Sequence, residues 1–147
     1  MAVKPVPEGY HTATPYLMVQ GAAELIEFLR QAFDARELHR MAGPGGKIMH
    51  AELKIGDSPV MLSDAQGQWQ PMPAAIYLYV ADADTTYNRA VKAGATSIMA
   101  VADQFYGDRN GGVKDRWGNM WWIATHKEDV PPEELEKRAK AAMAQRA

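Results

Sequence analysis

The chain has 147 residues, of which 47% are apolar and 23% are charged, as is ordinary for a single globular domain. The formal net charge of -2 provides no basic field for a polyanion, so we expect no nucleic-acid partner. The lack of cysteine excludes disulfides, thiolate catalysis and cysteine-bound metal centres. No apolar run reaches the roughly 18 residues of a membrane span, and the N-terminus lacks the apolar segment of a signal peptide. We therefore expect a cytoplasmic protein without a membrane partner.

The first half of the sequence predicts one helix among four strands. From Ala22, apolar residues recur at i, i+3, i+4 and i+7, which is one stripe of an amphipathic helix. Glycine-containing turns separate later runs of alternating residues, which are typical of strands. The predicted elements are a strand over 14–19, a helix over 22–34, and strands over 36–41, 47–55 and 60–63.

The second half repeats this order after a linker over 64–73. Its predicted elements are a strand over 75–80, a helix from Asp82 or Asp84 to Ala93, strands over 97–101, 113–116 and 120–125, and a polar loop over 107–112. The turn Gly56-Asp57 corresponds in position to Gly118-Asn119. We therefore predict an α+β fold in which one domain over 1–147 contains two βαβββ modules, over 14–64 and 75–126.

The tail over 128–147 predicts a separate helix. It begins at Pro131 and Pro132, and its acidic residues precede its basic ones, as the helix dipole prefers. Its apolar stripe is thin, so we expect a peripheral or subunit-contacting helix that takes no part in the core.

One face of the predicted strands has an unusual composition. Strand 47–55 directs Ala51, Leu53 and Ile55 to one side, where we expect the helices, and polar residues to the other. On the corresponding side of the other strands the sequence places Tyr16, Tyr77, Tyr79 and Trp122. Aromatic walls with a few polar groups are typical of a small-molecule pocket. The alternative is that these rings pack in the core or against a partner subunit.

Two polar residues on this face are candidates for catalysis. His50 and Glu52 are two residues apart on one strand, so their side chains share a face. They could act as a base and its orienting group, or as two ligands of a metal site without standard spacing. The alternative is a hydrogen-bonded polar pair without catalytic function. The remaining histidines have no metal-motif spacing.

Further ligand contacts are predicted outside the strands. Trp69, in the glutamine- and proline-rich linker, is an isolated aromatic residue that a ligand or a partner subunit could cover. Arg109, in the expected loop over 106–112, could hold an anionic group or form an internal pair with Asp108.

Four segments carry a resemblance to a known family. They are TPYLMV, AAELIEFLRQAFDARELHRM, GGKIMHAELKIGDSPVMLSD and YGDRNGGVKDRWGNMWWIAT. Over 14–126 the chain resembles the vicinal oxygen chelate superfamily, also called glyoxalase/bleomycin-resistance/dioxygenase, and within it the bacterial glyoxalase-like, phosphonate-operon-associated branch. The run DRWGNMWWIATH is the most specific part. The resemblance implies a half-open eight-stranded barrel around a cup, and a homodimer.

The resemblance also implies a divalent metal held by His and Glu near the start of the first strand and the end of the last strand of each module. By position these ligands fall near Thr14 and Ala75, at Trp122, and among residues 60–63, where the side chains are poor ligands. We therefore expect no metal and no cofactor.

These observations leave three functions open. The first is a protein of the bleomycin-resistance type that binds a planar or amphiphilic ligand in the cup without metal. The second is an isomerase, lyase or dioxygenase-like enzyme that uses a non-standard metal or acid–base chemistry at His50 and Glu52. The third is an interaction module built around its dimer.

Overall fold

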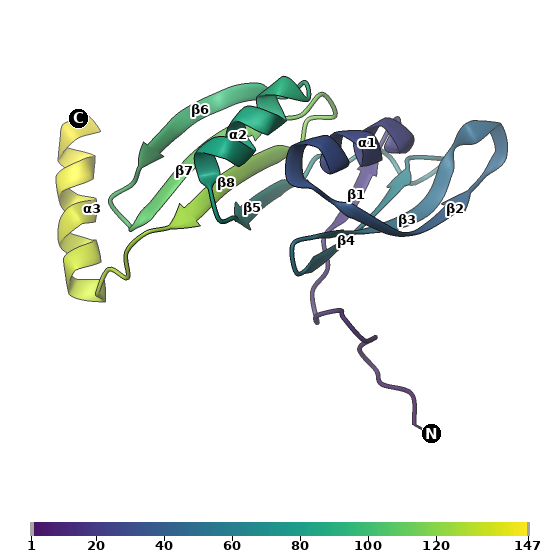
Figure 1. Cartoon of the computed structure of the whole chain (residues 1–147), viewed down its shortest axis with the longest axis horizontal. Helices are drawn as coiled ribbons and strands as arrows, with labels where there is room; N and C mark the ends of the chain where they lie inside the picture. The colour runs from purple at the N-terminus through teal and green to yellow at the C-terminus, as the bar shows by residue number, and fades with distance from the viewer. Residues whose placement is uncertain (1, 147) are drawn as a thin grey trace.

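The computed structural model describes residues 2–146 and confirms an α+β fold of two βαβββ modules followed by a C-terminal helix (Figure 1). The first module consists of β1 (Tyr16–Val19), α1 (Ala22–Phe33), β2 (Arg36–Ala42), β3 (Ile48–Ile55) and β4 (Ser58–Asp64), with a 3-10 turn, η1 (Pro44–Gly46), before β3. The second consists of β5 (Ala75–Tyr79), α2 (Ala83–Lys92), β6 (Thr96–Asp103), β7 (Asp108–Lys114) and β8 (Met120–His126).

Each module forms its own four-stranded sheet, and the two sheets have the same topology. The strand orders are β1-β4-β3-β2 and β5-β8-β7-β6. In each sheet the first strand runs parallel to the last, and the other neighbours are antiparallel. The repeat that turn spacing predicts is therefore a repeat of topology.

The two modules meet through their helices, which lie next to each other at the centre of Figure 1. Trp121 of β8 is fully buried, and its ring centroid lies 4.9 Å from that of Phe33 in α1. Its indole N–H donates to the Asp115 carboxylate at 2.9 Å, so burial leaves no polar group unpaired. One continuous core therefore spans both modules, and Trp121 has the packing role that its strand parity predicts.

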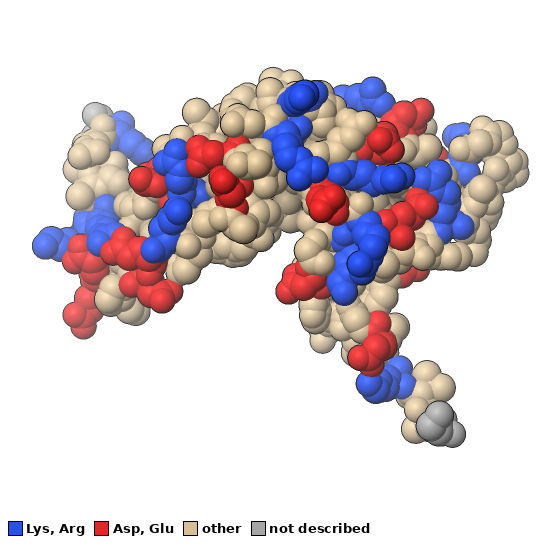
Figure 2. Space-filling model, in the orientation of Figure 1, with Lys and Arg blue, Asp and Glu red and all other residues tan. Residues whose placement is uncertain are grey.

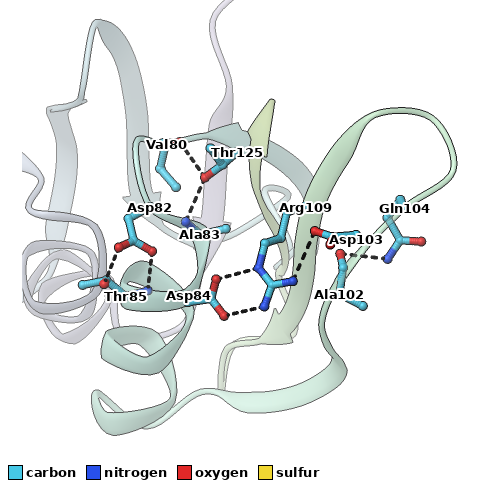
Figure 3. A network of polar contacts seen from close by, with 10 residues as sticks. All are labelled: Val80, Asp82, Ala83, Asp84, Thr85, Ala102, Asp103, Gln104, Arg109 and Thr125. Carbon is cyan, nitrogen blue, oxygen red and sulfur yellow. Dashed lines mark hydrogen bonds and ion pairs between the residues drawn. The ribbon is translucent and has the colours of Figure 1, made fainter. Parts of the chain in front are cut away.

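The end of the last strand fixes the start of the helix in each module. The Asp64 carboxylate at the end of β4 accepts hydrogen bonds from the backbone N–H groups of Gly21 and Ala22, at 2.8 and 2.9 Å, and from that of Ile48 at 2.7 Å. In the second module the Thr125 hydroxyl accepts from the N–H of Ala83 at 2.8 Å (Figure 3). These bonds satisfy N–H groups that a helix start leaves unpaired.

The expected polar loop over 107–112 is wrong, because Asp108–Lys114 forms β7 in the middle of the second sheet. The first part of this strand is hard to recognise in the sequence, because glycine, aspartate and asparagine are uncommon in strands. Gly111 fits here because an added Cβ would lie 2.7 Å from the Val101 side chain and 3.1 Å from the Met99 carbonyl oxygen. The chain reverses instead around Gly107, whose N–H donates to the Gln104 carbonyl at 3.2 Å.

The segment predicted as a linker is attached to the first module. The Met72 N–H donates to the Met18 carbonyl at 3.0 Å, which forms a bridge at the edge of β1. Gln66 and Trp69 exchange backbone hydrogen bonds of 2.9 Å across a tight turn. The backbone around Trp69 is therefore held in place although its ring is exposed.

The last helix, α3 (Pro132–Arg146), is peripheral as expected. It has no buried residue and stands at the far end of the second module in Figure 1. Arg138 attaches it by two bonds to Glu128, of 3.0 and 2.9 Å, and one to the Phe105 carbonyl. No helix within residues 2–146 is long and apolar enough to cross a membrane.

Substitution of Asp64 tests the capping arrangement. Burial raises the pKa of this carboxyl, but the backbone N–H donors lower it more, so the net pKa lies below its usual value. We expect Asp64→Ala to reduce the free energy of unfolding at neutral pH by about 2–4 kcal/mol, since three backbone donors lose a charged acceptor. Urea denaturation measures this. The control is Asp57→Ala in the exposed β3–β4 turn, which should cost much less; equal losses would contradict the capping role.

Candidate ligand-binding site

The sheet faces turned away from α1 and α2 carry the rings that the sequence places together. We call them the first open face, with Tyr16, His50 and Glu52, and the second open face, with Tyr77 and Trp122. Tyr16 and Tyr77 are 44% and 40% exposed, so neither side chain is buried in the core. Exposed aromatic rings on a rigid sheet are available to a ligand or a partner.

The first open face contains a hollow of about 420 Å³, which we call the first hollow. Tyr16 and Trp69, both predicted ligand contacts, lie on its wall, and Trp69 is 59% exposed. The remaining lining residues are Met18, Met49, Ser63, Asp64 and Gln66. The ring of Trp69 thus belongs to the same hollow as a ring from β1, although the two are far apart in sequence.

A chain of polar contacts runs beside the first hollow. The Nε2 atom of His50 lies 3.1 Å from Oε2 of Glu52, and its Nδ1 atom lies 3.3 Å from the Tyr16 hydroxyl. Glu52 also accepts a hydrogen bond from the hydroxyl of Tyr10, in the N-terminal arm. The two predicted catalytic candidates are therefore in contact, and each has a tyrosine as its second partner.

The second open face contains a smaller hollow of about 240 Å³, which we call the second hollow. Tyr77 and Trp122 line it, together with Met99, Gln104, Phe105, Tyr106, Asn110 and Arg146. The Trp122 ring lies across Gly112 of β7, where an added Cβ would come within 2.4 Å of the ring. Glycine at this position therefore allows the indole to lie against the sheet.

A buried carboxylate organises the polar side of the second open face. Asp108, only 5% exposed, accepts hydrogen bonds from the hydroxyls of Tyr77 and Tyr79 at 2.6 and 3.2 Å. Its other oxygen lies 2.8 Å from Nδ1 of His126, whose Nε2 lies 2.7 Å from Asp129. We call Asp108, Tyr77, Tyr79 and His126 the Asp108 cluster.

The pKa values within the Asp108 cluster shift in the direction of an ionised carboxylate. Burial raises the pKa of Asp108, but the bonds from Tyr77, His126 and Tyr79 lower it more, so the net pKa is below its usual value. Burial and then the bond to Asp108 raise the pKa of Tyr77. Burial and then the charge of Asp108 and the bond to it raise the pKa of Tyr79. Both phenols therefore keep their protons and donate them to Asp108.

Asn110 extends this cluster towards the second hollow. It is 1% exposed, and its side-chain nitrogen donates to the hydroxyls of Tyr77 and Tyr106 at 2.8 and 2.7 Å. Sequence reasoning missed Asn110, Tyr106 and His126 as site residues, because it assigned the first two to a loop. The available signal was the i, i+2 spacing of Asp108 and Asn110, which a strand directs to one face.

Tyr79 lines neither hollow; it lines a groove of about 830 Å³ between the modules. This groove also includes Tyr77 and the β3–β4 turn at Gly56 and Asp57. The five predicted aromatic contacts thus line two hollows and one groove, with Tyr77 shared between the groove and the second hollow. Within one chain they do not form a single cavity.

Arg109 does not line either hollow, which contradicts its expected place at the cup. It points to the opposite side of β7, where its guanidinium makes two bonds to Asp84, of 2.8 and 3.0 Å, and one to Asp103 at 3.2 Å (Figure 3). It also does not pair with Asp108. Arg109 therefore ties β6 and β7 to the start of α2.

The residues at the positions of the family metal do not fit a metal ion. Thr14, Ala75 and Trp122 provide at most one neutral hydroxyl. Across residues 2–146, no three His, Asp or Glu side chains gather closely enough to hold a metal ion. Acidic and basic residues are interspersed over the face shown in Figure 2, which is in keeping with the small net charge.

Comparison with known proteins decides the family. A model of the Glyoxalase/Bleomycin resistance protein/Dioxygenase superfamily matches residues 10–123. The chain belongs to this superfamily.

Individual proteins are also similar to this chain. The uncharacterized protein Rv0887c of Mycobacterium tuberculosis is 39% identical over 134 residues, which cover 84% of this chain and 79% of the relative. The crystal structure of TioX from Micromonospora sp. ML1 has a TM-score of 0.64 at 23% identity, covering 78% of this chain and 98% of TioX. The fosfomycin resistance protein FosX from Mesorhizobium loti has a TM-score of 0.58 at 18% identity, covering 86% and 97%. The two structures establish a shared fold.

The pairing of Asp108 with His126 makes stability depend on pH in two opposite ways. Asp108, with a lowered pKa, stabilises the fold above the ordinary carboxyl pKa, and this contribution is lost as the pH falls through the lowered value. The bonds to Asp108 and then Asp129 raise the pKa of His126. Its charge therefore stabilises the fold fully below the ordinary imidazole pKa, and the contribution is lost as the pH rises through the raised value.

We expect His126→Gln to destabilise the protein most at about pH 6 and hardly at all at about pH 9, because only the charged imidazole gains from both carboxylates. Urea denaturation at several pH values measures the difference between the variant and the parent. His39→Gln, on the exposed strand β2, is the matched control and should show no such trend. A constant difference across this range for His126→Gln would contradict the pairing.

Proposed function

We propose that this protein binds a planar or amphiphilic small molecule on its open faces, in the manner of the bleomycin-resistance type, without the family metal. The observation that carries the proposal is that one position of the family's metal ligands holds a ring, Trp122, which lines the second hollow and lies against Gly112. Rings with a few fixed hydrogen-bonding groups recognise a ligand by contact and orientation. The side chains at the family's metal-ligand positions, such as Thr14 and Ala75, are poor metal ligands and give no comparable support to chelation.

The size of the hollows supports a homodimer as the binding unit. The first hollow, of about 420 Å³, is in the lower part of the range of ordinary ligand pockets, roughly 300–1,000 Å³, and the second, of about 240 Å³, is below it. A second copy placed against the open faces would enclose a larger cavity and cover Tyr79 and Trp69, which are 67% and 59% exposed. We further propose a cytoplasmic location, no nucleic-acid or membrane partner, and membership of the phosphonate-operon-associated branch, which the quoted motifs favour.

The test uses 2-naphthol, a neutral planar amphiphile, as the probe. We expect it to bind the protein, and Trp122→Ala to weaken binding by about 1–3 kcal/mol through loss of ring contact and buried area. Isothermal titration calorimetry measures the affinity. His50→Ala is the matched control on the other open face and should leave most of the affinity. No binding by the parent, or variants that change only the monomer–dimer balance in sedimentation, would favour the interaction module.

A second function has one specific observation in its favour. Glu52, His50 and Tyr16 form a continuous series of contacts, in which a carboxylate orients an imidazole that faces a phenol. This is an arrangement suited to acid–base catalysis. An isomerase or lyase using these groups, with or without a non-standard metal, is therefore the alternative.

Metal analysis distinguishes a metal-dependent form of this alternative from the main proposal. We expect protein purified without chelator to contain no stoichiometric divalent ion, because the side chains at the family positions are poor ligands. Elemental analysis by mass spectrometry measures the content per chain. One ion per chain in the parent, and its loss in His50→Ala but not in His39→Ala, would establish a metal site at His50 and overturn the metal-free proposal.

A further inference from the structure

The groove between the modules is lined by both of them. Residues 77–81, in β5 and the segment after it, line it from the second module, and residues 54–58, around the β3–β4 turn, line it from the first. Its other lining residues lie where α1 ends and β2 begins: Phe33, Asp34 and Arg36. The volume of about 830 Å³ falls within the roughly 300–1,000 Å³ of ordinary ligand pockets. The groove is therefore large enough for a whole small molecule.

Two cations from neighbouring strands line this groove together. Arg36 of β2 and Lys54 of β3 are directly opposite each other in the antiparallel register, so their side chains leave the sheet on the same side. Like charges in this arrangement repel each other and destabilise a sheet. An anion placed between the two heads would replace that repulsion by two attractions. We call Arg36 and Lys54 the cation pair.

The cation pair has no acidic partner in the described part of the chain. Arg40, Arg109 and Arg138 each contact a carboxylate, at 2.7, 2.8 and 2.9 Å. Among residues 2–146, by contrast, no carboxylate forms an ion pair with Arg36 or Lys54. One unpaired cation on a surface is ordinary, but two opposite each other on the wall of a groove indicate a place for an anion.

The second module supplies two aromatic rings to the same groove. Tyr77 and Tyr79 are 40% and 67% exposed, and their ring centroids lie 5.2 Å apart. Both hydroxyls donate to the buried Asp108 carboxylate, which holds the rings in place. A planar ligand ring can therefore pack against them. The negative charge of Asp108 lies at this end of the groove, so an acidic group of the ligand would be repelled here and attracted by the cation pair.

We propose that the groove binds a planar aromatic monoanion, an aryl carboxylate, whose carboxylate contacts the cation pair and whose ring packs against Tyr77 and Tyr79. The guanidinium of Arg36 suits a carboxylate, because two of its N–H groups can donate in parallel to the two oxygens. A second copy placed against the open faces would enclose the ligand further. The inference rests on the proposed function, and it specifies the charge of the ligand and the cavity that takes it.

Two carboxylates limit the ligand to a single negative charge. Asp34, after α1, and Asp57, in the β3–β4 turn, also line the groove. Asp57 accepts a hydrogen bond from the Ser58 hydroxyl at 2.9 Å. A dianion such as a phosphate monoester would meet both acids at close range, so its second charge would be repelled. A monoanion at the cation pair keeps the charge of the whole groove near balance.

The test compares three probes that share one ring system: the anion 2-naphthoate, the neutral 2-naphthol and the cation 2-naphthylmethylammonium. We expect 2-naphthoate to bind at least about tenfold more tightly than either of the others at low ionic strength, because only it gains from the cation pair. Raising the salt concentration from roughly 0.02 to 0.5 M should reduce this preference, since salt screens charges near the surface. Titration calorimetry with the full chain measures the three affinities.

Variants locate the preference. Arg36→Gln and Lys54→Gln should each weaken 2-naphthoate binding by roughly 5- to 20-fold and leave 2-naphthol binding almost unchanged. Arg40→Gln, on the same strand but outside the groove, is the matched control and should change neither affinity. Urea denaturation checks that the variants fold. We expect Arg36→Gln and Lys54→Gln to be no less stable than the parent, because each removes a repulsion between like charges.

Four results would overturn the inference. Equal affinities for 2-naphthoate and 2-naphthol on the parent protein would refute the anion site while leaving the proposed function intact, because ring contact needs no charge. Tightest binding of 2-naphthylmethylammonium would assign the opposite charge to the ligand. A preference for 2-naphthoate that persists in both folded glutamine variants would place the anion elsewhere. Failure of all three probes to bind at millimolar concentration would overturn both the inference and the proposed function.

Discussion

The second open face depends on the buried Asp108 carboxylate. A buried anion is tolerated only when its oxygens are paired, and here two phenols and an imidazole pair them. That requirement fixes the directions of the Tyr77 and Tyr79 protons and, through Tyr77, the orientation of the Asn110 amide. One buried charge, that of Asp108, therefore sets the hydrogen-bond directions of Tyr77 and Asn110 beside the second hollow.

The first module makes the equivalent tyrosine contact and the equivalent helix cap with different residues. Tyr16 and Tyr77 occupy corresponding positions in β1 and β5, and each contacts a side chain from the third strand of its module, His50 or Asn110. The module ends differ as well, since Asp64 and Thr125 perform the same capping with a carboxylate and a hydroxyl. The duplicated topology thus supports two chemically distinct open faces, one with a His–Glu pair and one with a buried carboxylate and an amide.

The position of Trp122 illustrates how packing and recognition are linked. Its neighbour Trp121 points to the core and is fully buried against Phe33, while Trp122 points to the second hollow. In the register of β7 and β8, Gly112 lies opposite Trp122 and leaves the sheet surface free for the indole. The corresponding pair in the first module is Glu52 and Met61, so this ring platform belongs to the second module alone.

Sequence by itself determined the order of elements and the inner faces of the strands, because apolar periodicity is a local property. It placed the helix stripe beginning at Ala22, the core role of Trp121 and the peripheral last helix correctly. It began the strand that becomes β7 at residue 113 instead of Asp108, because Gly111 and Gly112 are selected by neighbours from other strands, and glycine carries no strand signal of its own. Only the tertiary structure decided that Arg109 turns to Asp84, that Asp108 turns to Tyr77, and that Asn110 keeps an unpaired oxygen. Those outcomes depend on which side chains from distant strands share a face, and hydrogen-bond partners are settled by that proximity and not by spacing along the chain.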